Sequence, residues 1–201
     1  MDNILYQIEN KLYLNITNQC PCACTFCIRT HKDKMGNSSV LWLEQEPTCE
    51  LIVEQLEKHN LEEYEELVFC GFGEPLVRVD IVCEIARYMR GKTKTPIKIN
   101  TNGLCNLYHK RDITPEFQGL IDIISISLNA SNPQDYLEIT RSQFGIESFE
   151  QMLDFAKKSQ QYVKEVVLSV VDVIGEEEIE KCRKICEEIQ VTYRVREFET
   201  K

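Results

Sequence analysis

The sequence lacks any run of about 20 apolar residues, the length that a helix needs to cross a bilayer. It also lacks, at its N-terminus, the basic segment and apolar core that mark a signal peptide. Basic residues are scarce relative to acidic ones, since 23 Lys and Arg against 33 Asp and Glu leave a formal charge of −10. A surface that binds duplex nucleic acid normally needs a net basic face. We therefore expect a cytoplasmic protein with no membrane association and no duplex-binding surface.

Tandem repeats, low-complexity runs and Gly/Ser-rich linkers are absent as well, so we expect residues 1–201 to form one domain. What the sequence does contain is ten cysteines. Without an export signal we expect their thiols to stay reduced, because disulfides are rare in the cytosol. Four of them fall between residues 20 and 27, and such a group in a reducing compartment predicts a metal site. The isolated cysteines are expected to be small buried residues.

Apolar, β-branched runs alternate with helical patterns along the chain. Strands are predicted at residues 11–17, 66–70, 97–102, 121–128, 166–173 and 192–196, and helices at 47–59, 79–90, 148–160 and 176–189. Ser148 is expected to cap the third of these helices. The alternation predicts parallel strands with right-handed crossovers. Six strands are fewer than the eight of a closed barrel, so we expect an α/β fold that is a partial (β/α)6 TIM-like barrel, with a doubly wound sheet as the alternative.

Several predicted strands are polar on one side only. In the fourth, Ser125, Ser127 and Asn129 alternate with apolar residues, so they share one face. Other strands place further polar residues in the same way: Asn15, Thr17, Lys98, Asn100, Asn102, Ser169, Arg194 and Arg196. Because helices should cover the apolar sides, the polar sides predict a ligand cavity; an exposed antiparallel face is the alternative.

The conspicuous motifs all follow predicted strands. NQCPCACTFC comes after the first, GFGEPL after the second, TNGL after the third, SLNAS after the fourth and SVVDV after the fifth. They are therefore expected together at the carboxyl ends of the strands, where barrels and open sheets bind ligands.

Cys20, Cys24 and Cys27 have the spacing C-x3-C-x2-C in a loop at residues 18–31. Three thiolates on one short loop suit a [4Fe–4S] cluster that leaves one iron open to another ligand. Zinc is the main alternative, because His31 could complete a Cys3His site, and thiol–disulfide chemistry is a further one. Cys22 lies inside the loop and could replace one ligand.

These segments resemble the radical S-adenosylmethionine (SAM) superfamily. The three-cysteine loop has Phe26 before its last cysteine, residues 71–75 resemble the Gly-Gly-Glu-Pro motif, and residues 126–130 resemble the Val-Ser-Leu-Asp-Gly motif. More closely, LNITNQCPCACTFCIR, VFCGFGEPL, INTNGL, SISLNA and LSVVDVI are similar to the small radical SAM proteins associated with TatD-family nucleases. Phe72 and Asn129 depart from the superfamily pattern, which has glycine and aspartate there.

The resemblance implies that Cys20, Cys24 and Cys27 ligate a [4Fe–4S] cluster whose fourth iron binds SAM. Reductive cleavage of SAM would give methionine and a 5′-deoxyadenosyl radical that abstracts hydrogen. Phe26 would flank the adenine, and Gly73 and Glu74 would meet the methionyl amine. Positions that commonly hold the carboxylate and ribose are Asn100, Ser127, Asn129 and Ser169.

We therefore expect an oxygen-sensitive radical SAM enzyme acting on an unidentified substrate. Because the chain ends just after its last predicted strand, we expect an open barrel mouth, suited to a protein or nucleic acid substrate or covered by a partner chain. The resemblance further implies an electron donor such as flavodoxin or ferredoxin and a functional link to a TatD-family nuclease. Two alternatives stay open: an activase that installs a glycyl radical on a partner protein, and a non-catalytic zinc or redox module.

Overall fold

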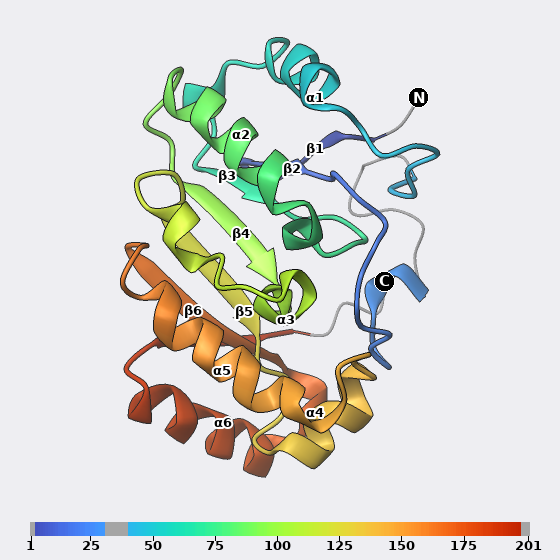
Figure 1. Cartoon of the computed structure of the whole chain (residues 1–201), viewed down its shortest axis with the longest axis vertical. Helices are drawn as coiled ribbons and strands as arrows, with labels where there is room; N and C mark the ends of the chain where they lie inside the picture. The colour runs from blue at the N-terminus through green and yellow to red at the C-terminus, as the bar shows by residue number, and fades with distance from the viewer. Residues whose placement is uncertain (1–2, 31–39, 198–201) are drawn as a thin grey trace.

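The computed structural model describes residues 3–30 and 40–197. Within these ranges the chain forms a seven-stranded sheet whose spatial order, β1 to β7, is the order of the sequence (Figure 1). β1 (Leu5–Ile8) pairs antiparallel with β2 (Lys11–Leu14). The other strands pair in parallel: β3 (Glu66–Phe69), β4 (Ile97–Thr101), β5 (Ile123–Ser127), β6 (Glu165–Val171) and β7 (Thr192–Arg196).

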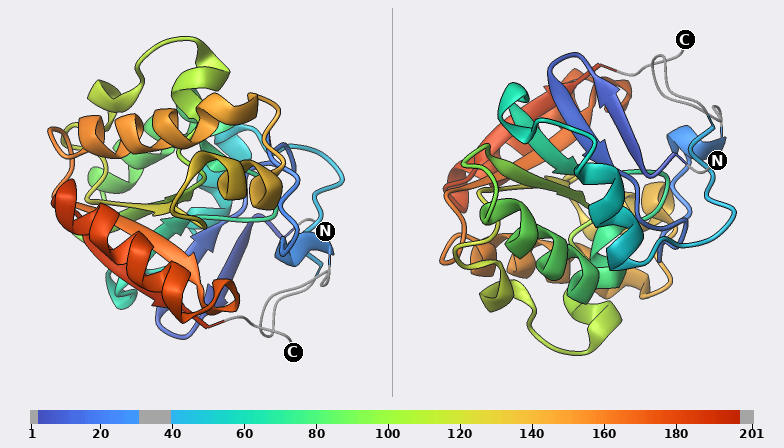
Figure 2. Two further views of the ribbon diagram at one scale, coloured as in Figure 1. Left: turned by 90° about the horizontal axis from the view of Figure 1, so that it is seen from below. Right: turned by 90° about the horizontal axis from the view of Figure 1, so that it is seen from above.

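Helices connect the parallel strands and lie outside the curved sheet, as the two views in Figure 2 show for α5 and α6. Their bounds are α1 (Cys49–Leu56), α2 (Val79–Arg90), α3 (Cys105–His109), α4 (Pro133–Thr140), α5 (Ser148–Ser159) and α6 (Glu176–Glu188). This arrangement confirms the expected partial barrel of parallel strands. None of the helices in the described ranges is long and apolar enough to span a membrane.

The apolar sides of the strands form the main core. Leu14, Ile99 and Ile126 are fully buried and belong to the same cluster as Ile85 of α2 and Phe155 of α5. Alternation along a strand directs these side chains outward, against the helices, and their polar neighbours to the inner face. The sequence prediction that helices cover the apolar sides is therefore confirmed.

The inner face of the sheet has two chemically different parts. Tyr6 and Tyr13 stack with ring centroids 5.0 Å apart, and Tyr6 forms a second apolar cluster with Leu41 and Phe72. This cluster fills the inner face beside β1 and β2. The polar part lies on β4, β5 and β6, where Asn100, Ser125 and Ser127 are half-buried and Lys98 and Ser169 are buried.

Several elements differ from the sequence prediction. β1 was not expected, because its four residues show no clear alternation and its pairing depends on the turn at Glu9, which has a φ of 51°. The short helices α3 and α4 were also missed. Ser148 is the first residue of α5 and not its cap: Glu147 precedes the helix, and the buried Ser148 hydroxyl bonds to Ser142 at 2.8 Å. Cys49, Cys83 and Cys105 are buried as expected, whereas Cys70 is only half-buried.

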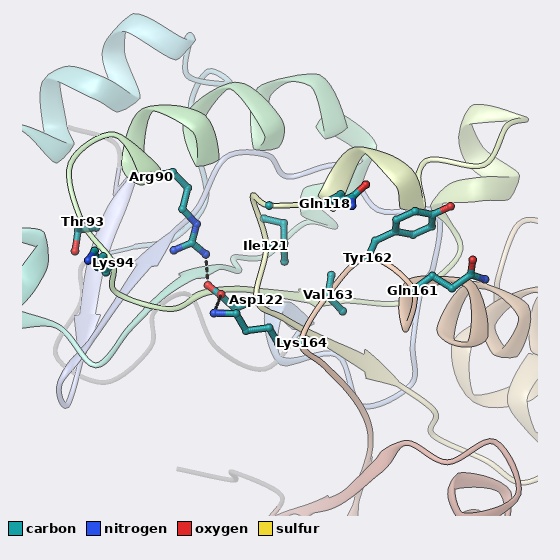
Figure 3. Close-up of a pocket in the computed structure, with 11 residues that line it drawn as sticks. Arg90, Thr93, Lys94, Gln118, Ile121, Asp122, Gln161, Tyr162, Val163 and Lys164 are labelled. Atoms are coloured by element: carbon teal, nitrogen blue, oxygen red, sulfur yellow. Dashed lines mark hydrogen bonds and ion pairs between the residues drawn. The ribbon is translucent and has the colours of Figure 1, made fainter.

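The amino ends of the strands are tied together by one carboxylate. Asp122 lies just before β5, accepts the Ile97 backbone N–H at 2.8 Å, and pairs with Lys164 at 2.8 Å and with Arg90. Asp122, Arg90 and Lys164 line a pocket of about 550 Å³ (Figure 3). The pocket lies at the rim opposite the predicted motifs, where barrel residues serve stability. Burial raises the pKa of the Asp122 carboxyl, but the hydrogen bonds from Lys164, Ile97 and Arg90 outweigh it and hold that pKa below its usual range.

We predict that Asp122→Asn lowers the free energy of unfolding at pH 7 by about 2–3 kcal/mol, because the amide removes the charge that Arg90 and Lys164 face. A carboxyl with a depressed folded-state pKa stabilises the fold above its unfolded pKa, and this contribution is lost as the pH falls through the folded value. Urea unfolding should therefore separate the two proteins at neutral pH and bring them together in acid.

The matched control is Asp154→Asn, which removes an exposed i,i+4 pair with Lys158 at 2.7 Å. Its effect should stay below about 0.5 kcal/mol. If the two variants have the same urea midpoint at pH 7, Asp122 does not hold this rim together.

Candidate cluster and cofactor site

The three predicted ligand cysteines lie on the loop that leaves β2 at its carboxyl end. Cys20, Cys24 and Cys27 are each half-buried. A 3₁₀ turn, Ile28–Thr30, follows Cys27, whose carbonyl accepts the Thr30 N–H at 3.0 Å. The thiols are thus carried by a segment with its own local hydrogen bonds. We call residues 18–31 the cluster loop; His31 lies outside the described residues.

The base of the cluster loop is anchored by Arg78 and Glu46. The Arg78 guanidinium donates to the carbonyls of Ile16 at 2.7 Å and Pro47 at 2.9 Å. Glu46 pairs with Arg78 and accepts the Gln19 side-chain amide at 2.8 Å. Five groups from three separate segments therefore fix the point where the loop starts.

The far side of the cluster loop is held by the C-terminal end of α4. Ala23 N–H donates to the Thr140 carbonyl at 3.0 Å, and Thr25 N–H donates to the Ile139 carbonyl at 2.9 Å. Figure 1 shows this loop, in blue, reaching the yellow α4. The α4 helix is capped by Asn132, whose side chain accepts the Asp135 N–H at 3.0 Å, as expected for a cap before a proline. The loop is therefore fixed to a well-capped helix from the other half of the sheet.

The thiols interact with one another and with a nearby cation. The thiol of Cys22, which is buried, lies beside those of Cys20 and Cys24. Its hydrogen bonding holds the pKa of both thiols below the ordinary value against the effect of burial, and the Arg29 charge acts in the same direction. Burial instead raises the pKa of the Cys27 thiol. Two of the three predicted ligands therefore lose their protons more readily than an ordinary cysteine, and the thiolate is the form that binds metal.

The GFGEP loop packs directly against the cluster loop. Glu74 N–H donates to the Gln19 carbonyl at 2.7 Å. A Cβ on Gly73 would lie 2.7 Å from that same carbonyl oxygen and closer still to the Thr17 carbonyl. At Gly71 a Cβ would instead overlap the side chain of Asn15, which would have to move. At Gly73 two backbones approach so closely that only glycine fits.

Glu74 is buried and spans the gap between two strand ends. Its Oε1 accepts the Thr101 hydroxyl at 2.7 Å and the Leu76 N–H at 3.1 Å, while Oε2 accepts the Asn102 N–H at 2.7 Å. Burial, followed by the nearby Cys20, raises the pKa of this carboxyl to about 7, although the hydrogen bonds oppose the shift. Glu74 therefore joins the loop after β3 to the end of β4, in addition to any contact with a ligand.

The two departures from the superfamily pattern have local explanations. Phe72 is buried in the inner apolar cluster and meets Trp42 edge-on, with centroids 5.1 Å apart. A glycine there would leave that cluster unfilled. Asn129 has a φ of 61°, a conformation that asparagine tolerates better than most residues. Its Oδ1 is buried without a hydrogen-bond partner, so it retains an unused acceptor at the end of β5.

The remaining predicted SAM-binding residues lie on the polar inner face. Asn100 and Ser125 are register partners, as are Ser127 and Ser169. Phe26 is half-buried in the cluster loop itself. Ser169 donates a long hydrogen bond, 3.4 Å, to the Ile126 carbonyl. The structure thus brings the end of β5 and the middle of β6 together on one side of the sheet, below the cluster loop.

The donor set fits a [4Fe–4S] cluster. No three His, Cys, Asp or Glu side chains in the described ranges converge on a point that one metal ion could occupy. Cysteine thiolates are the usual protein ligands of iron–sulfur clusters, and each of the three would bind a different iron. The zinc alternative needs His31, which is outside the described residues. The buried, unpartnered polar atoms of Asn129 and Tyr136 lie at the same rim and offer hydrogen bonds to a bound group.

Residues 14–189 match the model of the radical SAM superfamily, so the chain belongs to this superfamily. It is 28% identical over 177 residues to a GTP 3′,8-cyclase from Limosilactobacillus fermentum, which covers 87% of this chain and 49% of that protein. It is 31% identical over 134 residues to a protein assigned as a glycyl-radical enzyme activating enzyme in Methanocaldococcus jannaschii, covering 64% of this chain and 53% of the relative. The chain spans about half the length of these two relatives.

The fold also resembles that of SuiB from Streptococcus suis, whose structure contains its precursor peptide SuiA. The TM-score is 0.64 at 15% identity, over 97% of this chain and 40% of SuiB. The cofactors assigned from the sequence, a [4Fe–4S] cluster and SAM, are therefore those of the superfamily to which the chain belongs.

The residues that anchor the base of the cluster loop carry no signal in the sequence. Arg78 and Glu46 are ordinary polar residues in the sequence, and their partners lie on other segments. The Arg78–Glu46 contact joins side chains 32 positions apart in the chain at 3.7 Å. The local sequence pattern of one segment carries no information about contacts with side chains so far away in the chain.

We predict that Gly73→Ala lowers the free energy of unfolding by about 1–3 kcal/mol, as overpacking usually does, and also reduces iron loading. The added methyl group must push the GFGEP loop away from the cluster loop. Urea unfolding of the metal-free protein and iron content after anaerobic reconstitution measure the two effects.

Gly91→Ala is the matched control, since Gly91 has a φ of −72° and a Cβ there would meet nothing nearer than 3.4 Å. It should be neutral or slightly stabilising, because alanine restricts the unfolded chain. Equal stability and equal iron content in Gly73→Ala and wild type would show that the two loops do not need their close approach.

Proposed function

We propose that this protein is a radical SAM enzyme that uses a [4Fe–4S] cluster to cleave SAM reductively and abstract hydrogen from its substrate. The observation that carries the proposal is the placement of three half-buried thiols on one fixed loop, packed against the GFGEP loop at the carboxyl rim. Superfamily membership supports it. Residues 1–201 are proposed to act as one radical SAM core.

In this proposal Cys20, Cys24 and Cys27 hold the cluster. When bound and reduced, the cluster supplies one electron that breaks a sulfonium C–S bond of SAM, giving methionine and a 5′-deoxyadenosyl radical. The chain itself positions and shields the reacting groups. α4, Arg78 and the GFGEP loop keep the ligand thiols in place, and the buried Glu74 keeps the strand ends together.

The SAM contacts are proposed for the groups that surround the cluster loop. Gly73 and Glu74 would meet the amino group, and Phe26 would flank the adenine. The carboxylate and ribose would bind among Asn100, Ser127, Asn129 and Ser169. The unpartnered Oδ1 of Asn129 supports this, because a buried acceptor without a donor costs free energy until a ligand satisfies it.

The substrate is proposed to be a macromolecule, bound at the polar inner face. The similarity to a glycyl-radical activating enzyme and to the peptide-bound SuiB supports a protein or peptide. The resemblance to TatD-associated radical SAM proteins supports a link to a TatD-family nuclease. Flavodoxin or ferredoxin is proposed as the electron donor.

A second candidate function is an activase that installs a glycyl radical on a partner protein. The 31% identity to the Methanocaldococcus jannaschii relative favours it. The reaction with SAM would be the same, but the hydrogen would come from a backbone glycine of the partner. A doublet signal of a glycyl radical in the spin-resonance spectrum of a partner would distinguish this function.

We predict that Cys24→Ala abolishes SAM cleavage, because the loop then offers two ligands of the proposed three. The assay is anaerobic reconstitution with iron and sulfide, reduction with dithionite, and measurement of 5′-deoxyadenosine. Cys83→Ala is the control, since Cys83 is buried on α2 with its thiol near the Glu116 carbonyl.

Cys22→Ala tests whether Cys24 or Cys22 is the cluster ligand. It should keep the brown colour and the cleavage activity if Cys22 only neighbours the ligands. If cleavage persists in Cys24→Ala and is lost in Cys22→Ala, Cys22 is the ligand. A colourless wild-type protein with stoichiometric zinc would overturn the radical assignment in favour of a zinc module.

A further inference from the structure

One buried tyrosine at this rim has a hydroxyl without a partner. Tyr136 of α4 is 1% exposed, and its OH has no hydrogen-bond partner among residues 3–30 and 40–197. Its ring meets Phe149 edge-on, with centroids 5.7 Å apart, so packing fixes its direction. A buried hydroxyl that bonds neither to protein nor to water destabilises the fold. Phenylalanine would fill the same space without that cost, so the hydroxyl requires an explanation.

The position of Tyr136 points to the cluster loop. It lies one helical turn before Thr140, whose hydroxyl donates to the Tyr136 carbonyl at 2.7 Å and whose own carbonyl accepts the Ala23 N–H. Burial raises the pKa of the Tyr136 phenol, and the groups that raise it further are Cys22, Cys24, Glu74 and Cys20, in that order. The backbone bonds of α4 to the cluster loop thus place Tyr136 beside the segment that carries the thiols, and those thiols and Glu74 are the titratable groups that act on its phenol.

The other orphan hydroxyl in the described residues has no such surroundings. Ser159 is the last residue of α5, at the end of the helix that leads to the rim of Asp122. Tyr193, in contrast, has a hydroxyl that is satisfied by the Ile179 carbonyl at 2.9 Å. The unsatisfied hydroxyl of Tyr136 is thus linked to the cluster loop by position as well as by its missing partner.

We propose that Tyr136 donates a hydrogen bond to a sulfur of the bound [4Fe–4S] cluster or of its cysteine ligands and so raises the cluster's reduction potential. This inference rests on the proposed function, because it needs the cluster. A hydrogen bond to sulfur draws electron density from the cluster and favours the reduced state, which carries one more negative charge. A bound cluster would also supply the acceptor that the hydroxyl lacks.

The first test is a redox titration of the reconstituted full-length protein, followed by electron spin resonance. Tyr136→Phe should shift the reduction equilibrium about tenfold toward the oxidised cluster, which for one electron is about 59 mV more negative. Tyr193→Phe is the control, since it removes a partnered hydroxyl on β7, and its potential should equal that of wild type. A merely structural role for Tyr136 would not move the potential.

The second test compares the metal-free and loaded states. Without the cluster, Tyr136→Phe should unfold at the same or a higher urea concentration than wild type, because it removes an unsatisfied polar group. With the cluster, the order should reverse, and the variant should lose iron to a chelator several times faster than wild type. This change of sign is the signature of a hydroxyl whose partner is the bound group.

The outcomes distinguish a failure of the role proposed for Tyr136 from a failure of the proposed function. If wild type shows a [4Fe–4S] spectrum and Tyr136→Phe has the same potential and the same rate of iron loss, the role of Tyr136 is overturned and the proposed function stands. If wild type assembles no [4Fe–4S] cluster under anaerobic reconstitution, the proposed function and the role of Tyr136 both fail.

Discussion

The close approach of two backbones, the cluster loop and the GFGEP loop, is the constraint on which the site depends. The Glu74 N–H binds the Gln19 carbonyl, and the space between the loops has no room for a Cβ at Gly73. Glu74 then carries this contact on to the end of β4 through the Asn102 N–H. One residue thus relates the loops after β2, β3 and β4 to one another. The Gly73–Glu74 pair therefore has a structural role that is independent of any ligand.

The two rims of the sheet differ in their polar groups. At the amino ends, Asp122 joins β4, β5 and the segment before β6 through charge-assisted hydrogen bonds. At the carboxyl ends, buried groups such as the Asn129 Oδ1 and the Tyr136 hydroxyl lack partners. The charge-assisted network of Asp122 therefore lies at one rim, whereas the unpartnered groups nearest the cluster loop lie at the other. The pocket beside Asp122 lies at the amino ends of the strands, whereas the thiols lie at their carboxyl ends.

The sequence was sufficient to predict the parallel strands, their apolar outer faces and the grouping of the motifs at one rim. These features follow from local periodicity and from the rule that parallel strands end at the same edge. β1 was missed because its pairing needs a two-residue turn that its composition does not mark. The role of Tyr136 was missed because its missing partner appears only when α4 is packed on the cluster loop. Phe72 departs from the superfamily pattern, and the reason, its packing in the inner apolar cluster, is visible only in the folded structure.

The strand order has a consequence for how the site is made. Each strand pairs with the one synthesised just before it, so the sheet can grow in the direction of translation, and every new strand finds its neighbour in place. The cysteines leave the ribosome early, between β2 and β3, whereas the α4 carbonyls that bind Ala23 and Thr25 follow more than 100 residues later. Until α4 is in place, the cluster loop lacks the two backbone hydrogen bonds that Ala23 and Thr25 donate to it. The cluster loop therefore gains its full set of backbone contacts only after α4 has been synthesised.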